Sequence, residues 1–137
     1  MADGIIEGET GTQRLLGYVL DVGRGDGRAR CRLTLTEDHL NRHRALHGGI
    51  AAACLDNALG ATASLTVDDS GTAPFLTVSM TLNFHAPAHA GDALEATGRV
   101  TGGGRSLVFV EGELRAGPRL IATATGVFKR VPPERLA

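Results

Sequence analysis

One long segment of the sequence, residues 47–67 (HGGIAAACLDNALGATASLTV), is apolar or small on every side. A helix whose apolar residues surround its whole circumference is buried inside a protein rather than lying on its surface. Between Gly48 and Val67 the segment carries one formal charge, that of Asp56. Burying a carboxylate in such surroundings is costly unless it is paired, neutralised or used in function. We therefore predict a buried central helix and take Asp56 as its first candidate for a functional residue.

The segments around this helix have the alternation of apolar and polar residues that is typical of β-strands. Residues 15–22 and 28–36 are expected to form a hairpin, with Ala29, Cys31, Leu33 and Leu35 on one face of its second strand. Four more strands are expected after the helix, over residues 75–87, 93–101, 107–117 and 119–131. In the first of these four, strict alternation places Leu76, Val78, Met80, Leu82 and Phe84 on one face and Thr77 and Ser79 on the other.

The order β-β-α-β-β-β-β predicts an α+β fold in one domain over residues 1–137, with residues 1–13 as a loose polar arm. An antiparallel sheet that wraps around one long central helix is the hot-dog fold. A single sheet of this size cannot enclose the helix completely. We therefore expect a second copy of the chain to cover the remaining side, so that the protein is at least a homodimer.

Charge and composition exclude several classes of function. The net charge is −1 and the isoelectric point is near 6.5, which gives no general attraction to nucleic acid or to an anionic membrane. Tryptophan is absent and aromatic residues are few, which argues against a surface that stacks on bases. The N-terminus has no signal peptide pattern, no apolar run is long enough to span a bilayer, and the two cysteines form no CxxC motif. We expect a cytoplasmic protein.

The start of the central helix, His47-Gly48-Gly49, is a candidate site for a carbonyl oxygen. The first N–H groups of a helix have no intrahelical partner, and they lie at the positive end of the helix dipole. Glycines leave this backbone open to a ligand. The alternative is that the two glycines only allow the chain to turn into the helix.

Asp56 follows Gly48 by eight residues, which is about 12 Å along a helix. One helix therefore cannot bring both groups to the same small reacting group. Two antiparallel copies related by a two-fold axis can, with Gly48 of one chain facing Asp56 of the other. The alternative is a structural Asp56 that is hydrogen-bonded to backbone or paired with an arginine.

Two other motifs have weaker interpretations. His39, His43 and His47 are four residues apart, but the intervening charges and the glycines that follow argue against a metal-binding helix, so no metal site is predicted. The GGGRS segment at residues 102–106 is either a tight hairpin turn or a backbone cradle that holds a phosphate with Arg105.

Taken together, the pattern Asn41–x5–His47-Gly48-Gly49–x6–Asp56-Asn57 resembles the signature of hot-dog acyl-CoA thioesterases of the PaaI-like and thioesterase superfamily member 2 type, in the 4HBT superfamily. The resemblance extends over about residues 13–131. It implies that Asp56 is the general base or the nucleophile toward the thioester. It also implies that the Gly48 amide of the opposite subunit polarises the carbonyl, that Asn41 and His47 organise this end of the site, and that Thr77 orients the water.

The same resemblance implies further contacts to the substrate or its coenzyme A portion, from Gly49, Ser79, Gly104, Arg105, Ser106 and Lys129. It implies hydrolysis without a cofactor, in dimers that pair into tetramers. Three other functions remain as alternatives: a non-catalytic acyl-CoA binding module, a hot-dog hydratase or dehydratase, and a purely structural oligomer. The sequence does not identify the acyl group.

Overall fold

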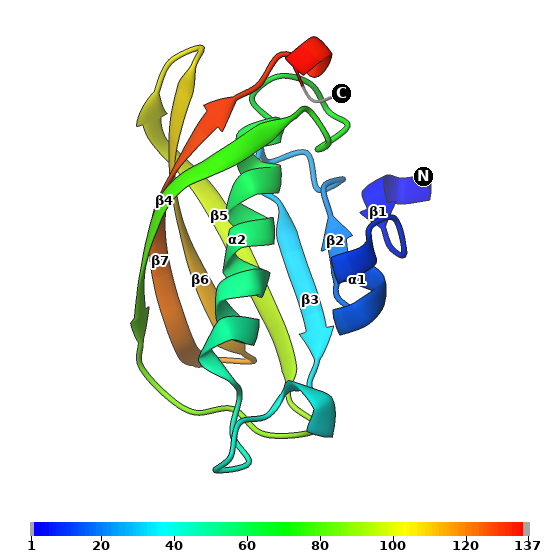
Figure 1. Ribbon diagram of the computed structural model, residues 1–137, viewed down its shortest axis with the longest axis vertical. Coiled ribbons are helices and arrows are strands. Elements are labelled where there is room, and N and C mark those ends of the chain that lie inside the picture. Colours follow the sequence, from blue (N-terminus) through cyan, green and yellow to red (C-terminus); the bar gives the residue numbers. More distant parts are fainter. Residues whose placement is uncertain (1, 136–137) are drawn as a thin grey trace.

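The structure is a computed structural model, which describes residues 2–135. Its central element is the helix α2 (Gly48–Ser64), which lies lengthwise against one face of a seven-stranded antiparallel sheet (Figure 1). The face of the sheet toward α2 is called the inner face below, and the opposite one the outer face. This arrangement confirms the predicted hot-dog fold.

The sheet has the strand order β1-β2-β3-β5-β6-β7-β4, so that β4 is an edge strand. Its strands are β1 (Ile5–Ile6), β2 (Val19–Asp21), β3 (Arg30–Thr34), β4 (Phe75–Phe84), β5 (Ala93–Gly103), β6 (Leu107–Ala116) and β7 (Arg119–Arg130). A short helix α1 (Gly11–Leu16) and the 3₁₀ turns Ala2–Gly4, Glu37–His39 and Pro133–Arg135 complete the described chain.

Small residues let α2 lie very close to the sheet. A Cβ atom added to Gly98 of β5 would lie 3.0 Å from the Ala58 carbonyl oxygen and would collide with Thr62. The Thr62 hydroxyl donates to that carbonyl at 2.7 Å and accepts from the Ala29 N–H at 3.0 Å, so it ties the helix to the sheet. Leu55, Ala58 and Leu59 are fully buried in this contact. The close approach fixes the helix along the sheet.

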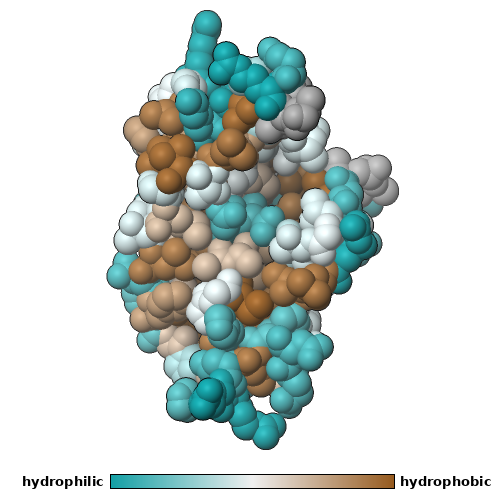
Figure 2. Space-filling model, viewed as in Figure 1, coloured by the Kyte–Doolittle hydropathy of each residue, from teal (hydrophilic) through white to brown (hydrophobic). Residues whose placement is uncertain are grey.

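The opposite side of α2 is not covered by the sheet (Figure 1). Six residues spaced three or four apart are exposed or half-buried there, namely Gly49, Ala52, Ala53, Asp56, Asn57 and Gly60. Figure 2, from the same viewpoint, shows hydrophobic and neutral residues over much of this face, with a small hydrophilic area near its middle. We call these six residues the open stripe of α2.

The N-terminal segment differs from the prediction of a loose arm over residues 1–13. Ile5 and Ile6 pair with β2, and the buried Gln13 side chain donates to the Ile6 carbonyl at 2.7 Å. The strand expected at residues 15–22 is also shorter, because its first two residues belong to α1. Thr10 caps the start of this helix and Gly17, in the left-handed conformation, ends it.

The predicted alternation of β4 is wrong at the start of the strand, where a β-bulge places Leu76 on the outer face and Thr77 on the inner one. Thr77 pairs with Phe128, and the next pair is Ser79 with Val127, so an extra residue interrupts the register at Val78. Phe128 is buried on the inner face, which places Thr77 there as well. Beyond the bulge Met80 and the following even-numbered residues face inward. The bulge thus turns Thr77 toward α2, a role that bulges often have beside functional sites.

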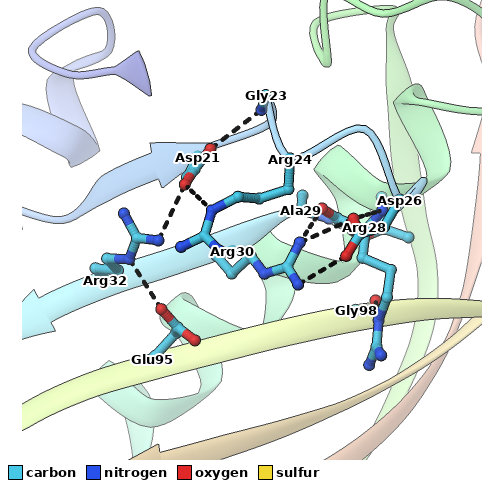
Figure 3. Close-up of polar contacts among 11 residues, drawn as sticks. Asp21, Gly23, Arg24, Asp26, Arg28, Ala29, Arg30, Arg32, Glu95 and Gly98 are labelled. Carbon is cyan, nitrogen blue, oxygen red and sulfur yellow. Dashed lines mark hydrogen bonds and ion pairs between the residues drawn. The ribbon is translucent and has the colours of Figure 1, made fainter. Parts of the chain in front are cut away.

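Arginines and carboxylates form a network of ion pairs on the outer face at β2 and β3 (Figure 3). The buried Asp21 carboxylate accepts from the Gly23 N–H and from Arg24 and Arg32 at 2.9–3.1 Å. Arg32 also pairs with Glu95 at 2.9 Å. A hollow of about 1040 Å³ on this face is lined by four arginines, Arg28, Arg30, Arg32 and Arg115. The last three are already paired with carboxylates, so we assign the hollow no ligand.

These contacts change the pKa of two aspartates. Burial raises the pKa of Asp21, but the Gly23 N–H and the guanidinium groups of Arg24 and Arg32 lower it more, so that it lies below its usual value. The hydrogen bonds from Arg30 lower the pKa of Asp26 to about 2. Each of these two carboxylates therefore stabilises the folded state when it is ionised.

We expect Asp21→Asn to lower the free energy of unfolding by about 1–2 kcal/mol at pH 7, because it removes the negative charge that pairs with two partly exposed arginines. A lowered folded-state pKa gives stability that is present above the unfolded pKa of about 3.9 and is lost as the pH falls through the folded value. The difference in the free energy of unfolding between wild type and variant, measured by urea unfolding, should therefore narrow between pH 4 and pH 2. Asp69→Asn, at an exposed loop position, is the control. A difference in the free energy of unfolding that stays constant with pH would contradict this account.

Candidate active site

The first turn of α2 leaves one backbone amide free. His47 is the N-cap residue, and its Nδ1 accepts from the Gly49 N–H at 2.8 Å. The N–H groups of Ile50 and Ala51 donate to the His47 carbonyl at 3.0 and 3.1 Å. Within residues 2–135 the Gly48 N–H has no hydrogen-bond partner. The Gly49 amide is thus occupied by the cap, and the Gly48 amide remains as the donor available to a ligand.

Asn41 is held in a tight turn ahead of the helix. Its side-chain oxygen accepts from the backbone N–H groups of His43 at 2.8 Å and Ala45 at 3.2 Å. This fixes the carboxamide and leaves its NH₂ group without a partner in the described part of the chain. Asn41 and Gly48 line the same hollow, of about 420 Å³. The structure therefore brings together two of the predicted residues, both able to donate to an oxygen atom.

Asp56 lies in the middle of the open stripe, and Thr77 lies against it. The Thr77 hydroxyl donates to Asp56 Oδ1 at 2.7 Å, which the bulge in β4 makes geometrically feasible. Between residues 2 and 135 no arginine or lysine forms an ion pair with Asp56, and its second oxygen has no protein partner. The alternative of an aspartate tied to an arginine therefore does not apply. One carboxylate oxygen is held and the other is free to act on a ligand.

Within one chain these two groups are separate half-sites. Gly48 and Asp56 belong to the same continuous helix and are eight residues apart, or about 12 Å along its axis. The hollow that contains Gly48 and Asn41 does not include Asp56 or Thr77. Neither half-site alone has both a carboxylate and a free amide donor.

Five of the six residues predicted to contact the substrate or coenzyme A lie on β4, β7 and the turn between β5 and β6, whereas Gly49 lies apart from them in the first turn of α2. Ser79 and Lys129 flank inward-facing positions and therefore lie on the outer face, whereas Thr77 is on the inner face. Gly104, Arg105 and Ser106 form the exposed turn between β5 and β6, and the Ser106 carbonyl accepts from the Arg130 N–H at 2.8 Å. The turn therefore lies next to the end of β7 that carries Lys129.

Arg105 and Lys129 have no ion-pair partner among residues 2–135, unlike many of the arginines on the outer face. Lys129 pairs in register with Leu76, one residue from Thr77. Lys129 thus lies on the outer face of β7, beside the part of β4 that carries Thr77, and Arg105 lies in the turn next to this end of β7.

The three histidines at four-residue spacing do not form a metal site. The His39 ring is buried, with Nδ1 accepting from the Thr36 N–H at 2.9 Å and Nε2 within 2.8 Å of the Leu16 carbonyl oxygen. His47 caps α2, and His43 lies in the exposed turn after Asn41. Across the chain from residue 2 to 135, no three metal-binding side chains converge.

Phe84 is a site residue that the sequence reasoning missed. Alternation assigned it to the apolar face of β4, which is correct, but the side chain is 60% exposed. Its ring lies against the start of α2, with Cζ 3.5 Å from the position that a Cβ atom on Gly48 would occupy. The only signal in the sequence is its position near the end of a strand, three residues before Pro87.

Comparison with known families identifies this arrangement. A family model described as "Thioesterase superfamily" matches residues 43–122, which is more than half of the chain and includes α2 with both of its half-site residues. The chain therefore belongs to the thioesterase superfamily. It is a thioester hydrolase, which confirms the resemblance to thioesterases that the sequence motif indicated.

Relatives of known sequence or structure agree with this membership. The chain is 32% identical to human acyl-coenzyme A thioesterase 13 over 112 residues, which cover 80% of this chain and 78% of the relative. The structure of the Escherichia coli PaaI protein from the phenylacetic acid degradation operon matches with a TM-score of 0.77 and 25% identity, over 90% of this chain and 86% of that one. The Bacillus halodurans protein BH2602, solved with CoA, matches with a TM-score of 0.70 and 26% identity, over 80% and 71% of the two chains.

No helix in residues 2–135 has both the length and the apolar character that crossing a membrane requires.

Proposed function

We propose that the protein hydrolyses acyl-CoA thioesters to a free acid and coenzyme A, at sites shared between two chains of a homodimer. The observation that carries this proposal is the Asp56 carboxylate, held by Thr77 on the uncovered side of α2 with one oxygen free. The free Gly48 amide, eight residues away on the same helix, supplies the complementary half of the site. The names of the relatives support coenzyme A as the carrier of the acyl group.

In the proposed reaction Asp56 acts as the general base. Its free oxygen takes a proton from a water molecule as the water oxygen forms a bond to the thioester carbonyl carbon. The carbon–sulfur bond then breaks, and the proton returns to the departing thiolate to give the thiol of coenzyme A. The other product is the carboxylic acid. Thr77 positions the carboxylate through the 2.7 Å hydrogen bond and thereby the water.

Negative charge develops on the carbonyl oxygen when water attacks. In our proposal the Gly48 N–H and the Asn41 NH₂ group of the partner chain donate to this oxygen, which is supported by the hollow that both residues line and by the absence of a partner for either donor within residues 2–135. His47 supports this role indirectly, because its ring occupies the Gly49 amide and holds the first turn in shape. Donors preorganised in this way contribute about 3–4 kcal/mol each to lowering the barrier.

The open stripe of α2 supports an antiparallel homodimer. Its members are mostly Gly and Ala, which allow two helices to approach closely, and Asp56 lies in the middle of the stripe. A two-fold axis would bring each Asp56 to the partner's Gly48 and create two equivalent sites. We further propose that dimers pair into tetramers. The two buried, unpaired cysteines suit a reducing compartment, and we place the protein in the cytoplasm.

We expect Gly48→Pro to reduce kcat by about 10²–10³-fold, because it removes one donor from the charged carbonyl oxygen. Proline is well suited to the first position of a helix, and the extended backbone of His47 is compatible with a following proline, so the helix should survive. Gly48→Ala is the matched control, since it keeps the N–H and its Cβ would make ordinary contact with Phe84 at 3.5 Å. Thiol release from acyl-CoA measures both. Equal losses in the two variants would contradict a role for the amide.

Mixing two inactive variants tests whether the site is shared. Asp56→Asn should be nearly inactive, because the amide cannot accept the proton of water. Random co-assembly of Asp56→Asn with Gly48→Pro chains would make half of the dimers mixed, each with one intact site of two, so about a quarter of wild-type activity should return. Co-expression with two affinity tags allows the mixed dimer to be isolated and assayed. Mixtures no more active than the parents would show that the site lies within one chain.

Arg105 and Lys129 are expected to bind the phosphate groups of coenzyme A. Arg105→Ala and Lys129→Ala should each raise KM several-fold with little change in kcat, because they contact a part of the substrate that does not react. Arg44→Ala is the control for the loss of an exposed arginine, since Arg44 lies in the turn after Asn41 and pairs only loosely with Glu37 at 3.4 Å. The KM effect should weaken at high salt. A fall in kcat with unchanged KM would contradict this assignment.

A further inference from the structure

The hollow beside the start of α2 is built mainly from apolar side chains. Its floor consists of Ala51 and Ile121, which are 0% and 1% exposed. Phe84 and Pro87 form the outer wall, and Asn41 and Gly48 contribute the two donors described above. The hollow therefore combines an apolar surface with a pair of aimed hydrogen-bond donors, which is the usual composition of a small-molecule site.

Phe84 is the feature of this hollow that requires an explanation. It is paired with the buried Ala122 and faces inward from the edge strand, yet 60% of it is exposed. Its ring edge lies beside Gly48, the residue whose amide is free, 3.5 Å from the place that a Cβ atom on Gly48 would take. That exposure is of one chain; in the proposed homodimer Asp56 of the partner chain reaches the Gly48 amide, so the Phe84 ring lies at the edge of the shared site, where the substrate can contact it.

The chemistry of a thioester indicates which group binds there. When the carbonyl oxygen accepts from the Gly48 amide, the carbonyl carbon has the acyl chain on one side and the sulfur of coenzyme A on the other. The coenzyme A side continues as the pantetheine arm, whose amide groups need hydrogen-bond partners that the apolar wall at Phe84 does not offer. The acyl side is the apolar one. It is the part of the substrate that matches this hollow.

We infer that the hollow binds the acyl group and that Phe84 determines which acyl groups are accepted, with a preference for a compact apolar group over a long chain. This inference rests on the proposed function and deepens it. The volume of about 420 Å³ is near the lower end of the range of roughly 300–1000 Å³ for ligand pockets. The buried floor formed by Ala51 and Ile121 closes the hollow toward the core, so a long chain would leave its end in water.

The test measures kcat/KM for acetyl-, hexanoyl- and palmitoyl-CoA with wild type, Phe84→Ala and Phe84→Trp. Wild type should prefer hexanoyl-CoA to the other two. Phe84→Ala should lower the hexanoyl-to-acetyl ratio by about tenfold, because the apolar wall is lost. Phe84→Trp should shift the preference toward acetyl-CoA by narrowing the hollow. Phe109→Ala is the matched control, since Phe109 is an exposed phenylalanine on β6 whose register partner, Val127, lies on the outer face. It should leave the ratios unchanged.

The outcomes separate this inference from the proposed function. If wild type hydrolyses none of the thioesters, both are overturned. If it hydrolyses them but the Phe84 variants keep the wild-type ratios, only the acyl site is overturned. Light scattering of each variant detects a further case: a Phe84→Ala protein that becomes monomeric and loses all three activities equally would make Phe84 an interface residue and overturn the inference. Altered ratios in a protein of unchanged mass support it.

Discussion

The close packing of α2 on the sheet is the constraint on which the rest of the structure depends. Glycine at position 98 and the small Ala58 allow contact between backbones, and the Thr62 hydroxyl joins the two layers. Because one side of α2 packs tightly on the sheet, the residues on its other side are held in a fixed position and orientation relative to the sheet. A rigid platform of this kind can present a carboxylate and a backbone amide with the accuracy that catalysis needs.

The same constraint separates the two half-sites. A straight helix keeps Gly48 and Asp56 about 12 Å apart whatever else changes, so no rearrangement within one chain can join them. The bulge in β4 completes the second half-site by turning Thr77 inward to hold Asp56. The first half-site is completed by the His47 cap, which occupies the Gly49 amide and leaves the Gly48 amide free. Each half-site is thus completed by a local feature, a β-bulge or a helix cap, rather than by a regular helix or strand.

The central helix, most of the strands and the motif residues could be predicted, because their signals are local: period, composition and spacing. The faces on which the first residues of β4 lie could not be predicted, because a bulge leaves the alternation of residue types intact and only the pairing with β7 reveals it. The N-terminal arm was misjudged for a related reason, because its order comes from the Gln13 side chain reaching the Ile6 carbonyl rather than from apolar periodicity. Phe84 looked like an ordinary core residue because exposure is not encoded in alternation.

The two cysteines have a practical consequence. Cys31 on β3 and Cys54 on α2 are 0% and 1% exposed, and hydrogen bonding with Cys54 together with burial raises the pKa of the Cys31 thiol. Neither is therefore readily available to a colorimetric thiol reagent while the fold is intact. Such a reagent would report the product of turnover without background from the protein. In the absence of substrate, its slow reaction with these two thiols would measure how often the helix lifts away from the sheet.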